Sequence, residues 1–232
     1  MKKKSFIFTA TLFLASLVLV SSCNKEDDHN HSDSASNARV LVVHASPDAP
    51  GVDLLVDNTK VNSAALTFPN NTGYLQVPSG TRNVKVNAAG TTTTVIDANL
   101  ALEKDKNYTV FAVDSLSKIS AVVLEDNLAA PAAGKAHVRF VHLSPNAPAV
   151  DIAVAATGTV VFGNKSFKEA TDFTPLDAGT YNLDVRVAGT STVALVLPAI
   201  TLEAGKIYTV FAKGFLTGTG AQELGAAIIV NN

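Results

Sequence analysis

Two copies of a short motif bring the residue types of a hydrolytic triad close together in the sequence. The first set is His44, Ser46 and Asp53, and the second set is His142, Ser144 and Asp151. In a nucleophilic enzyme the histidine would deprotonate the serine, and the aspartate would orient the imidazole ring. The sequence therefore holds the residue types of a hydrolase, provided that the fold leaves them free to react.

Local patterns around both motifs favour a structural role instead. Each serine precedes a proline, which biases the serine towards an extended or turn conformation. Neither serine lies in the Gly-x-Ser-x-Gly turn that presents a nucleophile to substrate. His44 follows Val40 and Val42 at alternate positions, so its ring is expected on the core side of a strand, and His142 is placed in the same way. We interpret each histidine as a strand-end residue that bonds to the Ser-Pro turn, and expect no catalytic residue.

The two aspartates are out of phase with the apolar residues around them. Asp53 lies between Val52 and Leu54, and Asp151 also has apolar neighbours on both sides. An aspartate that faces water beside a proline turn is usually solvated or caps the turn. We therefore expect both to be exposed, with a role in ligand binding left open.

The start of the chain has the layout of a secretory signal peptide. Three lysines precede an apolar run over residues 6–20, and small residues lead to Cys23, the only cysteine. The run is short for a membrane span, which needs about 20 residues. Residues 1–22 resemble a bacterial lipoprotein signal, which implies that Cys23 is acylated, for example with palmitate, and attaches the protein to a membrane. A single cysteine allows no internal disulfide.

Residues 23–37 are expected to form a disordered tether. From Asn24 onward this stretch is polar, with Ala35 as its one apolar residue, so it cannot bury enough surface to fold. Its start resembles the Lys-plus-acidic signal that sends lipoproteins to the surface of some Gram-negative bacteria; a plain charged tether is the alternative. The predicted location is the outer membrane, on either face. His29 and His31 could bind a metal weakly, but a flexible tail lacks fixed geometry, and we expect neither metal nor cofactor.

The rest of the chain is an internal duplication. The segment from Ala38 to Asp53 recurs from Ala136 to Asp151, and Tyr-Thr-Val-Phe-Ala occurs at both 108–112 and 208–212. The order of the matches is kept, and the offset drifts only from 98 to 100 residues. We therefore predict two domains, 38–128 and 136–232, joined by a small-residue linker at 129–135.

Each copy is expected to be a β-sandwich. In the stretch 81–88, for example, apolar and polar residues alternate strictly, which is typical of a strand with one face on a core. Seven short strands in about 95 residues favour an immunoglobulin-like sandwich. Tyr108 and Tyr208 each follow a leucine by six residues, as in a tyrosine corner. The expected strands of the first copy are 38–44, 52–57, 73–77, 81–88, 92–98, 107–113 and 119–124.

With its lipoprotein-like start, the repeated His-x-Ser-Pro-x-x-Pro-x-Val-Asp motif resembles the bacterial family called domain of unknown function 4397. The resemblance covers nearly everything from Ala38 onward and implies an extracytoplasmic β-sandwich without an established activity. We expect a membrane-anchored, non-catalytic binding, adhesion or scaffolding module whose ligand is an envelope protein or a glycan. The alternatives are a hydrolase and a carbohydrate-binding accessory lipoprotein, although a chain without Trp and with four Tyr offers few sugar platforms.

The charge of the chain argues against nucleic acid as a partner. Removal of residues 1–22 leaves 15 Lys and Arg against 20 Asp and Glu, a net charge of −5. Contacts to phosphates need an excess of basic residues. Nucleic-acid binding is therefore the function class that the composition excludes most clearly.

Overall fold

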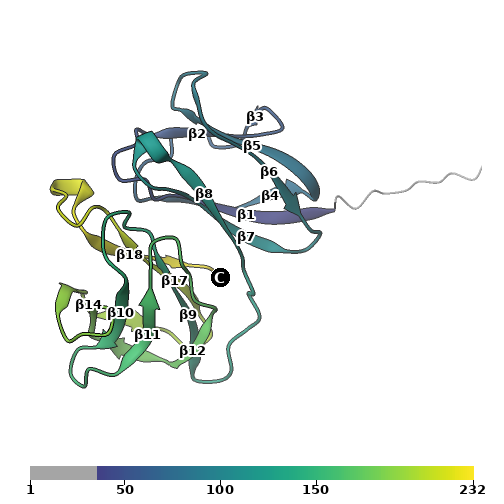
Figure 1. The fold of residues 1–232 in the computed structure, drawn as a ribbon. Helices are drawn as coiled ribbons and strands as arrows, with labels where there is room; N and C mark the ends of the chain where they lie inside the picture. The colour runs from purple at the N-terminus through teal and green to yellow at the C-terminus, as the bar shows by residue number, and fades with distance from the viewer. Residues whose placement is uncertain (1–35) are drawn as a thin grey trace, which may run out of the picture. The chain divides into compact units, whose positions relative to one another are not determined.

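The computed structural model describes residues 36–232, so the predicted signal peptide, Cys23 and nearly all of the predicted tether lie outside the described residues. Residues 35–232 form one compact unit. The described part is built from strands, with two single-turn 3-10 helices, η1 (Leu116–Lys118) and η2 (Gly220–Gln222) (Figure 1). The predicted all-β class is confirmed. Neither of the helices found in residues 36–232 is long and apolar enough to cross a membrane.

The first copy consists of two four-stranded sheets with a shared core. Their strand orders are β4-β1-β7-β8 and β3-β2-β5-β6. β1 is antiparallel to β4 but parallel to β7. Inward-facing residues of both sheets, such as Val40, Val110, Leu54 and Val86, pack together. The strands are β1 (Asn37–His44), β2 (Val52–Val56), β3 (Thr59–Lys60), β4 (Asn71–Pro78), β5 (Gly80–Ala88), β6 (Thr94–Leu102), β7 (Asn107–Val113) and β8 (Ser120–Glu125).

The second copy repeats this arrangement with one change. Its sheets have the orders β12-β9-β17-β18 and β11-β10-β14-β15, and β13 pairs with β16. The strand equivalent to β5 is divided into β13 and β14, and the strand equivalent to β6 is divided into β15 and β16. The break between β15 and β16 contains Pro198, which has no amide hydrogen to donate to a neighbouring strand. The strands are β9 (Lys135–His142), β10 (Val150–Val154), β11 (Val160–Lys165), β12 (Thr174–Asp177), β13 (Gly179–Tyr181), β14 (Leu183–Val187), β15 (Val193–Val196), β16 (Ile200–Leu202), β17 (Ile207–Lys213) and β18 (Gly225–Val230).

The expected strands of the first copy all overlap observed ones. The structure adds the two-residue strand β3 and places β6 at Thr94–Leu102, where 92–98 was expected. Both tyrosine corners are confirmed. The hydroxyl of Tyr108 accepts a hydrogen bond from the backbone N–H of Glu103 at 3.1 Å, and that of Tyr208 accepts one from Glu203 at the same distance.

The central strands β1, β7, β9 and β17 are buried on both faces. Their inner faces line the two sandwich cores, while outer-face residues form a third apolar cluster that joins the copies. In this cluster the rings of Phe111 and Phe211, which occupy equivalent positions in β7 and β17, lie 5.9 Å apart. The two copies therefore share an apolar interface in addition to their separate cores.

Candidate functional site

The two motif histidines are fully buried at the ends of β1 and β9. His44 Nε2 lies 2.9 Å from the carbonyl oxygen of Pro50, and His142 Nε2 lies 3.0 Å from that of Pro148. A carbonyl oxygen only accepts hydrogen bonds, so Nε2 carries the proton in each ring, and Nδ1 of the neutral ring does not. Each histidine is thus a buried strand-end residue, and the partner of its ring is the carbonyl group of the second proline of the motif.

Burial also determines the charge of these rings. It lowers the pKa of both His44 and His142, and the hydrogen bonds to the proline carbonyls only partly oppose this effect. Nδ1 of each ring has no hydrogen-bond partner within residues 36–232. Both histidines are therefore held neutral, because the protonated ring would bring a charge into the core.

The two motif serines are equally inaccessible, but only one is hydrogen-bonded. Ser46 Oγ donates to the carbonyl oxygen of Asp114 at 2.6 Å. Ser144 Oγ has no partner among the described residues. Both serines are 0% exposed, so neither hydroxyl can reach a substrate in solution.

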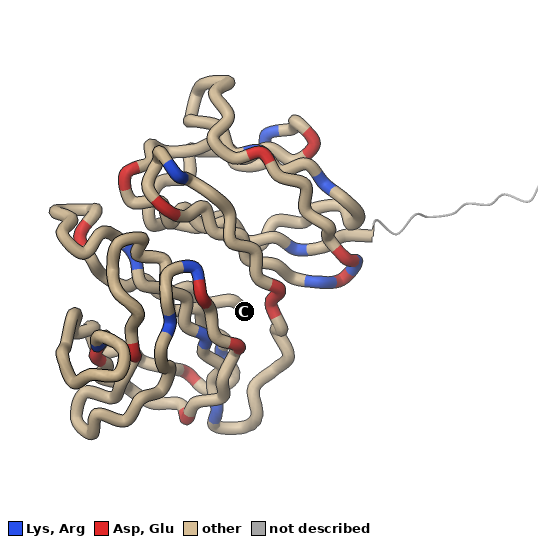
Figure 2. Tube along the Cα trace, in the orientation of Figure 1, with Lys and Arg blue, Asp and Glu red and all other residues tan. Residues whose placement is uncertain are grey.

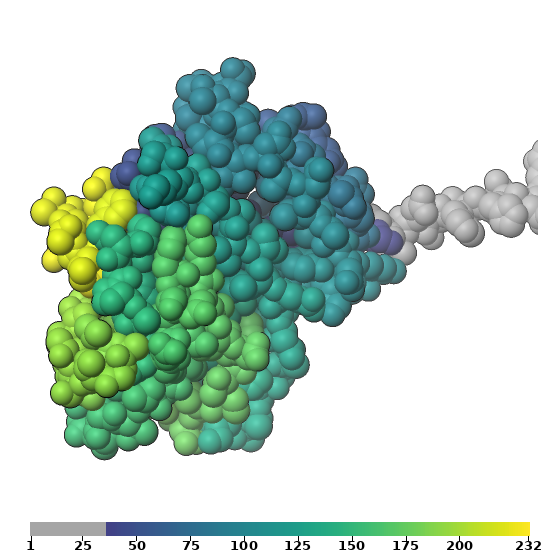
Figure 3. Space-filling view, in the orientation of Figure 1, coloured from purple at the N-terminus to yellow at the C-terminus, as the bar shows by residue number. Residues whose placement is uncertain are grey.

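One residue of each motif that the sequence interpretation missed completes the turn. Asp48 Oδ1 accepts the backbone N–H of Leu116 at 2.8 Å, and Asn146 Oδ1 accepts that of Leu216 at 2.7 Å. Both capping residues stand four positions after the motif histidine, and Asp and Asn commonly bond to backbone in this way. The motif therefore ties the turn after β1 or β9 to the loop after β7 or β17. The later part of the chain that includes the second of these loops is drawn in yellow in Figure 3.

The two motif aspartates also bond to turns, but they are not exposed as expected. Asp53 and Asp151 are each 8% exposed. Asp53 forms an ion pair with Lys60 Nζ at 2.7 Å and accepts the N–H of Gly90 at 3.0 Å. The hydrogen bond from Lys60 is the main reason why the pKa of Asp53 is lowered. Strand β3, which was not expected, supplies this lysine, so the prediction of an exposed carboxylate was wrong.

Asp151 is covered by backbone rather than by a lysine. Its carboxylate accepts the N–H groups of Asn164 at 2.6 Å and Gly189 at 2.8 Å. Gly90 and Gly189 have φ values of 71° and 72°, a left-handed conformation that favours glycine. Each aspartate therefore stabilises a tight glycine turn between two strands.

The histidine, serine and aspartate of each motif do not have the mutual hydrogen bonds of a catalytic triad. Each histidine bonds to a proline carbonyl, and each aspartate bonds to turn amides. A nucleophilic triad requires the histidine to bond to the serine and the aspartate to the histidine. Within residues 36–232, no group of three or more His, Cys, Asp or Glu side chains is arranged to hold a metal ion.

A buried polar network lies between the two copies. Arg139 of β9 forms an ion pair with Asp126, which follows β8, at 2.6 Å. Arg139 Nε donates to Thr209 Oγ1 at 2.9 Å, and Nη2 donates to Thr109 Oγ1 at 3.0 Å. Asp126 also accepts the hydroxyls of Tyr74 and Thr109. Burial and the neighbouring carboxylate raise the pKa of Tyr74, so its hydroxyl stays protonated and remains a donor.

Comparison of the two repeats was the one sequence signal that could have revealed this network. The alignment of the motifs places Arg139 where the first copy has Leu41. The strand registers place Asp126 where the second copy has Asn231. Asp126 follows Glu125, which pairs with Tyr108, and Asn231 follows Val230, which pairs with Tyr208. A charged residue at an apolar position of one copy, matched by a second charge in the other, indicates a contact between them.

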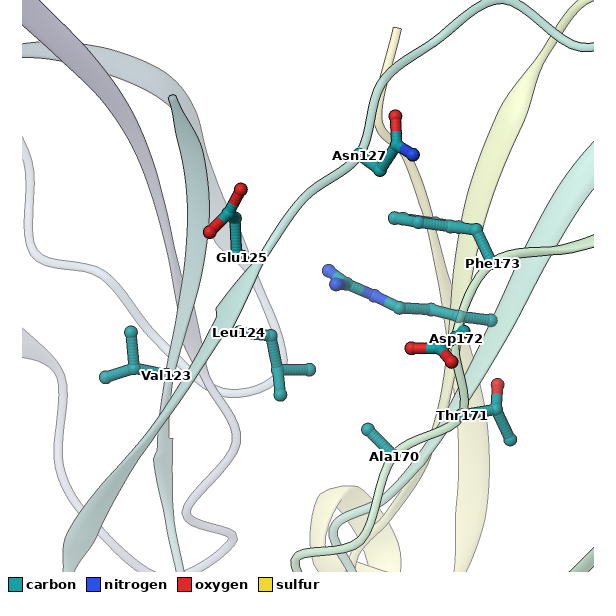
Figure 4. A pocket seen from close by; sticks show the side chains of 9 residues that line it. Val123, Leu124, Glu125, Asn127, Ala170, Thr171, Asp172 and Phe173 are labelled. Atoms are coloured by element: carbon teal, nitrogen blue, oxygen red, sulfur yellow. The ribbon is translucent and has the colours of Figure 1, made fainter. Parts of the chain in front are cut away.

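The pocket in Figure 4 has a volume of about 520 Å³ and opens beside this network. Its walls are residues 123–125 of β8, Asn127, Arg139 of β9, and residues 170–173, before β12. The guanidinium of Arg139 lies 4.6 Å from the centre of the Phe173 ring. Because this guanidinium is already paired and hydrogen-bonded, the pocket offers no free cation to an anionic ligand.

Within residues 36–232 the charged residues do not gather into a field of one sign. In the tube view of Figure 2, Lys and Arg are interspersed with Asp and Glu in both copies. Several of them pair locally, for example Lys106 with Glu125 at 2.6 Å and Lys135 with Asp177 at 2.7 Å. This distribution gives no support for a polyanionic partner.

Comparison with known proteins gives a family but no assigned activity. The family model described as "Domain of unknown function (DUF4397)" matches residues 38–153 and 152–232. No curated protein matches the chain. One matching solved structure is CBMbc (family CBM26) from Eubacterium rectale Amy13K in complex with maltoheptaose. It is 11% identical, covers 83% of this chain and 95% of its own, and has a TM-score of 0.26, which is too low to carry an argument about ligand or fold.

Proposed function

The chain belongs to the family described as a domain of unknown function (DUF4397), and we propose that it is a lipid-anchored, non-catalytic binding or scaffolding module of the cell envelope. Its ligand would be an envelope protein or a glycan. Cys23 would carry the acyl chains, and the two β-sandwich copies would present the binding surface. Two or more acyl chains suffice for stable membrane attachment.

The observation that carries the non-catalytic proposal is the burial of the repeated motif. His44, His142, Ser46 and Ser144 are 0% exposed. Three of these four side chains form a hydrogen bond to a backbone carbonyl of a loop. Groups used in this way stabilise loops and are unavailable to a substrate, which supports a structural role for the motif in both copies.

The direction of β1 places the motif turn and the start of the first copy at opposite ends of this strand. β1 begins at Asn37 and ends at His44. The segment from Cys23 therefore joins the first copy at the end of β1 opposite the motif turn. The loops that the motif holds together, 45–51 and 114–119, would face away from the attachment point.

Metabolic labelling with palmitate tests the anchor. The wild-type chain should incorporate the label, and Cys23→Ala should abolish incorporation and leave an unprocessed precursor. Ser22→Ala is a matched control, because a small residue before the cysteine is retained. Normal labelling of Cys23→Ala would show that the protein is not a lipoprotein of this kind.

Protease treatment of intact cells tests which face of the membrane carries the module. We expect digestion of the wild-type protein. Replacement of residues 25–28 by alanine should protect the module if this stretch is an export signal, because the module would then stay in the periplasm. Equal digestion of both proteins would reduce residues 25–28 to a plain tether.

A pull-down from envelope extract tests the binding role. Residues 24–232 without acyl chains would serve as bait, with a heat-denatured bait as control, and a glycan array would test sugars separately. Specific recovery of one envelope component, or binding to one class of glycan, would support the proposal. Failure of both would contradict the binding role and leave the anchor result unaffected.

A further inference from the structure

The last strand of the chain leaves one edge of the second sandwich open. β18 is an edge strand of the sheet β12-β9-β17-β18, and no strand within residues 36–232 pairs with its outer side. Its sequence, Gly-Ala-Ala-Ile-Ile-Val, contains no charged residue and no proline. Edge strands are normally protected by charges, prolines or bulges, because an apolar edge invites another strand to pair with it.

The register of β18 shows which residues face outward. Asn231 donates its N–H to the carbonyl oxygen of Ile207. Bonded and non-bonded pairs alternate in an antiparallel ladder. The neighbouring pairs of Val230 with Tyr208, Ile228 with Val210 and Ala226 with Ala212 are therefore non-bonded. Each of Ala226, Ile228 and Val230 thus directs an N–H and a C=O to the open side.

The same three residues border an apolar groove, named here the β18 groove. It has a volume of about 430 Å³ and is lined by residues 197–201, by β18 and by the core residues Tyr208 and Val210, with Glu203 as its one charged residue. Ile228 and Val230 are 44% and 53% exposed, although their side chains lie on the core side of the sheet. The outer edge of β18 therefore offers both unpaired backbone groups and exposed apolar side chains.

Within the described residues, the equivalent region of the first copy has no such groove. The space between β6 and its neighbours has a volume of only about 10 Å³ and is lined by Ile96, Ala98, Leu100 and Ala121. β6 pairs with β5 along almost its whole length, whereas the equivalent strand of the second copy is broken at residues 197–199. The equivalent edge strand β8 ends in Glu125, which forms an ion pair with Lys106. Only the second copy combines an uncharged edge with an open groove.

We propose that a second copy of this chain covers the β18 groove, through antiparallel pairing of the two β18 strands about Ile228. In this register Ile228 lies opposite Ile228 of the second copy, and Ala226 lies opposite Val230. Every outward N–H and C=O of the one strand then meets an outward group of the other. Directly opposed residues lie on the same face of a sheet, so the apolar side chains of each β18 would extend the core beside the other copy's groove.

The self-complementary pattern is the reason for choosing a second copy over another polypeptide. Filling the groove requires apolar side chains at every second position along the whole edge, and β18 itself supplies Ala226, Ile228 and Val230 at this spacing. Two identical surfaces that pair about a two-fold axis form a closed dimer, which leaves no further edge of this kind exposed. Dimerisation would therefore remove the aggregation hazard of this edge.

Disulfide trapping tests the register directly. The chain from Asn24 onward contains no cysteine, and Cα atoms of directly opposed bonded residues are about 5.5 Å apart, within the range of a disulfide. Residues 24–232 with Ile228→Cys should form a covalent dimer on mild oxidation. Val123→Cys is the matched control: Val123 pairs with Val110 as Ile228 pairs with Val210, and it is 41% exposed. It should form no covalent dimer on the same oxidation.

Sedimentation equilibrium tests the association without a covalent bond. Wild-type 24–232 should show a concentration-dependent dimer. Ile228→Lys should weaken the dimer by about tenfold or more, because two lysines would meet at the centre of the interface, while Val123→Lys should leave it unchanged. A wild-type protein that stays monomeric, or equal cross-linking of Ile228→Cys and Val123→Cys, would overturn the proposal and leave the groove to another polypeptide.

Discussion

Arg139 Nη1 lies 2.6 Å from Asp126 Oδ1, and the two side chains are 3% and 0% exposed. This ion pair is the centre of the polar network between the two copies, and the same interface holds the apolar cluster in which the rings of Phe111 and Phe211 lie 5.9 Å apart. Removal of either partner of a buried ion pair strongly destabilises a protein, because the remaining charge is left buried and unpaired. The pair therefore helps to fix how the two copies pack.

The first prediction concerns this ion pair. Arg139→Leu introduces the residue that the first copy carries at the equivalent position, Leu41. It should lower the free energy of unfolding by about 3–5 kcal/mol, because Asp126 loses its counter-charge in a buried site. Denaturant unfolding followed by circular dichroism measures this loss.

A double variant and a surface pair provide the controls for that experiment. Asp126→Asn introduces the residue found at the equivalent position in the second copy, Asn231, and in combination with Arg139→Leu it should recover most of the lost stability. Lys135→Ala, which breaks an exposed ion pair with Asp177, should change stability by no more than about 0.5 kcal/mol. A loss for Arg139→Leu no larger than for Lys135→Ala would contradict the importance of the buried pair.

The two motif serines should differ in their effect on stability. Ser46→Ala removes a 2.6 Å hydrogen bond to the carbonyl oxygen of Asp114, and should cost about 1 kcal/mol. Ser144→Ala removes a hydroxyl without a partner in the described part of the chain, and should be close to neutral or slightly stabilising. Denaturant midpoints of the two variants check this, and equal losses would show that Ser144 has a partner of its own.

The motif histidines should be more costly to replace than the serines. His44→Ala and His142→Ala leave the carbonyl oxygens of Pro50 and Pro148 without their donors and open space in the core. Each should cost about 1–3 kcal/mol. A thermal or denaturant melt with unchanged midpoint in both variants would contradict the structural role.

The free energy of unfolding should fall as the pH drops below about 6.5, the unperturbed pKa of histidine. The pKa of both His44 and His142 is lowered in the folded state by burial. Between the folded and unfolded values the unfolded chain binds more protons, so acid favours unfolding, and this loss is absent well above pH 6.5. Unfolding curves at a series of pH values between 7 and 5 measure the slope. A His44→Gln, His142→Gln double variant should show a smaller slope, and an unchanged one would assign it to other groups.

The tyrosine corners should contribute to both copies. Tyr108→Phe and Tyr208→Phe each remove a buried hydroxyl that accepts a backbone N–H at 3.1 Å. Each should lower the free energy of unfolding by about 1 kcal/mol. Tyr181→Phe is the control, because its bond to the Asp177 carbonyl is exposed. If all three variants matched the wild type, the corners would have no role in stability.

Local patterns in the sequence predicted more of the fold than of the contacts between distant segments. Strands such as β1 and β7 were found because apolar residues at alternate positions and flanking prolines or glycines are local signals. The ion pair that Lys60 forms with Asp53 was not predicted, because Lys60 comes from a two-residue strand without a pattern of its own. The ion pair between Arg139 and Asp126 depends on how the copies pack, and a single copy contains no signal for it.

Reaction with a serine-directed fluorophosphonate tests most directly the claim that the repeated motif is structural and the protein non-catalytic. The probe would be added to native residues 24–232, and intact-mass spectrometry would follow adduct formation, with an active serine hydrolase as positive control. Because Ser46 and Ser144 are 0% exposed and the motif histidines bond to proline carbonyls, the account predicts no adduct. An adduct on the wild-type protein that Ser46→Ala or Ser144→Ala abolishes would contradict it.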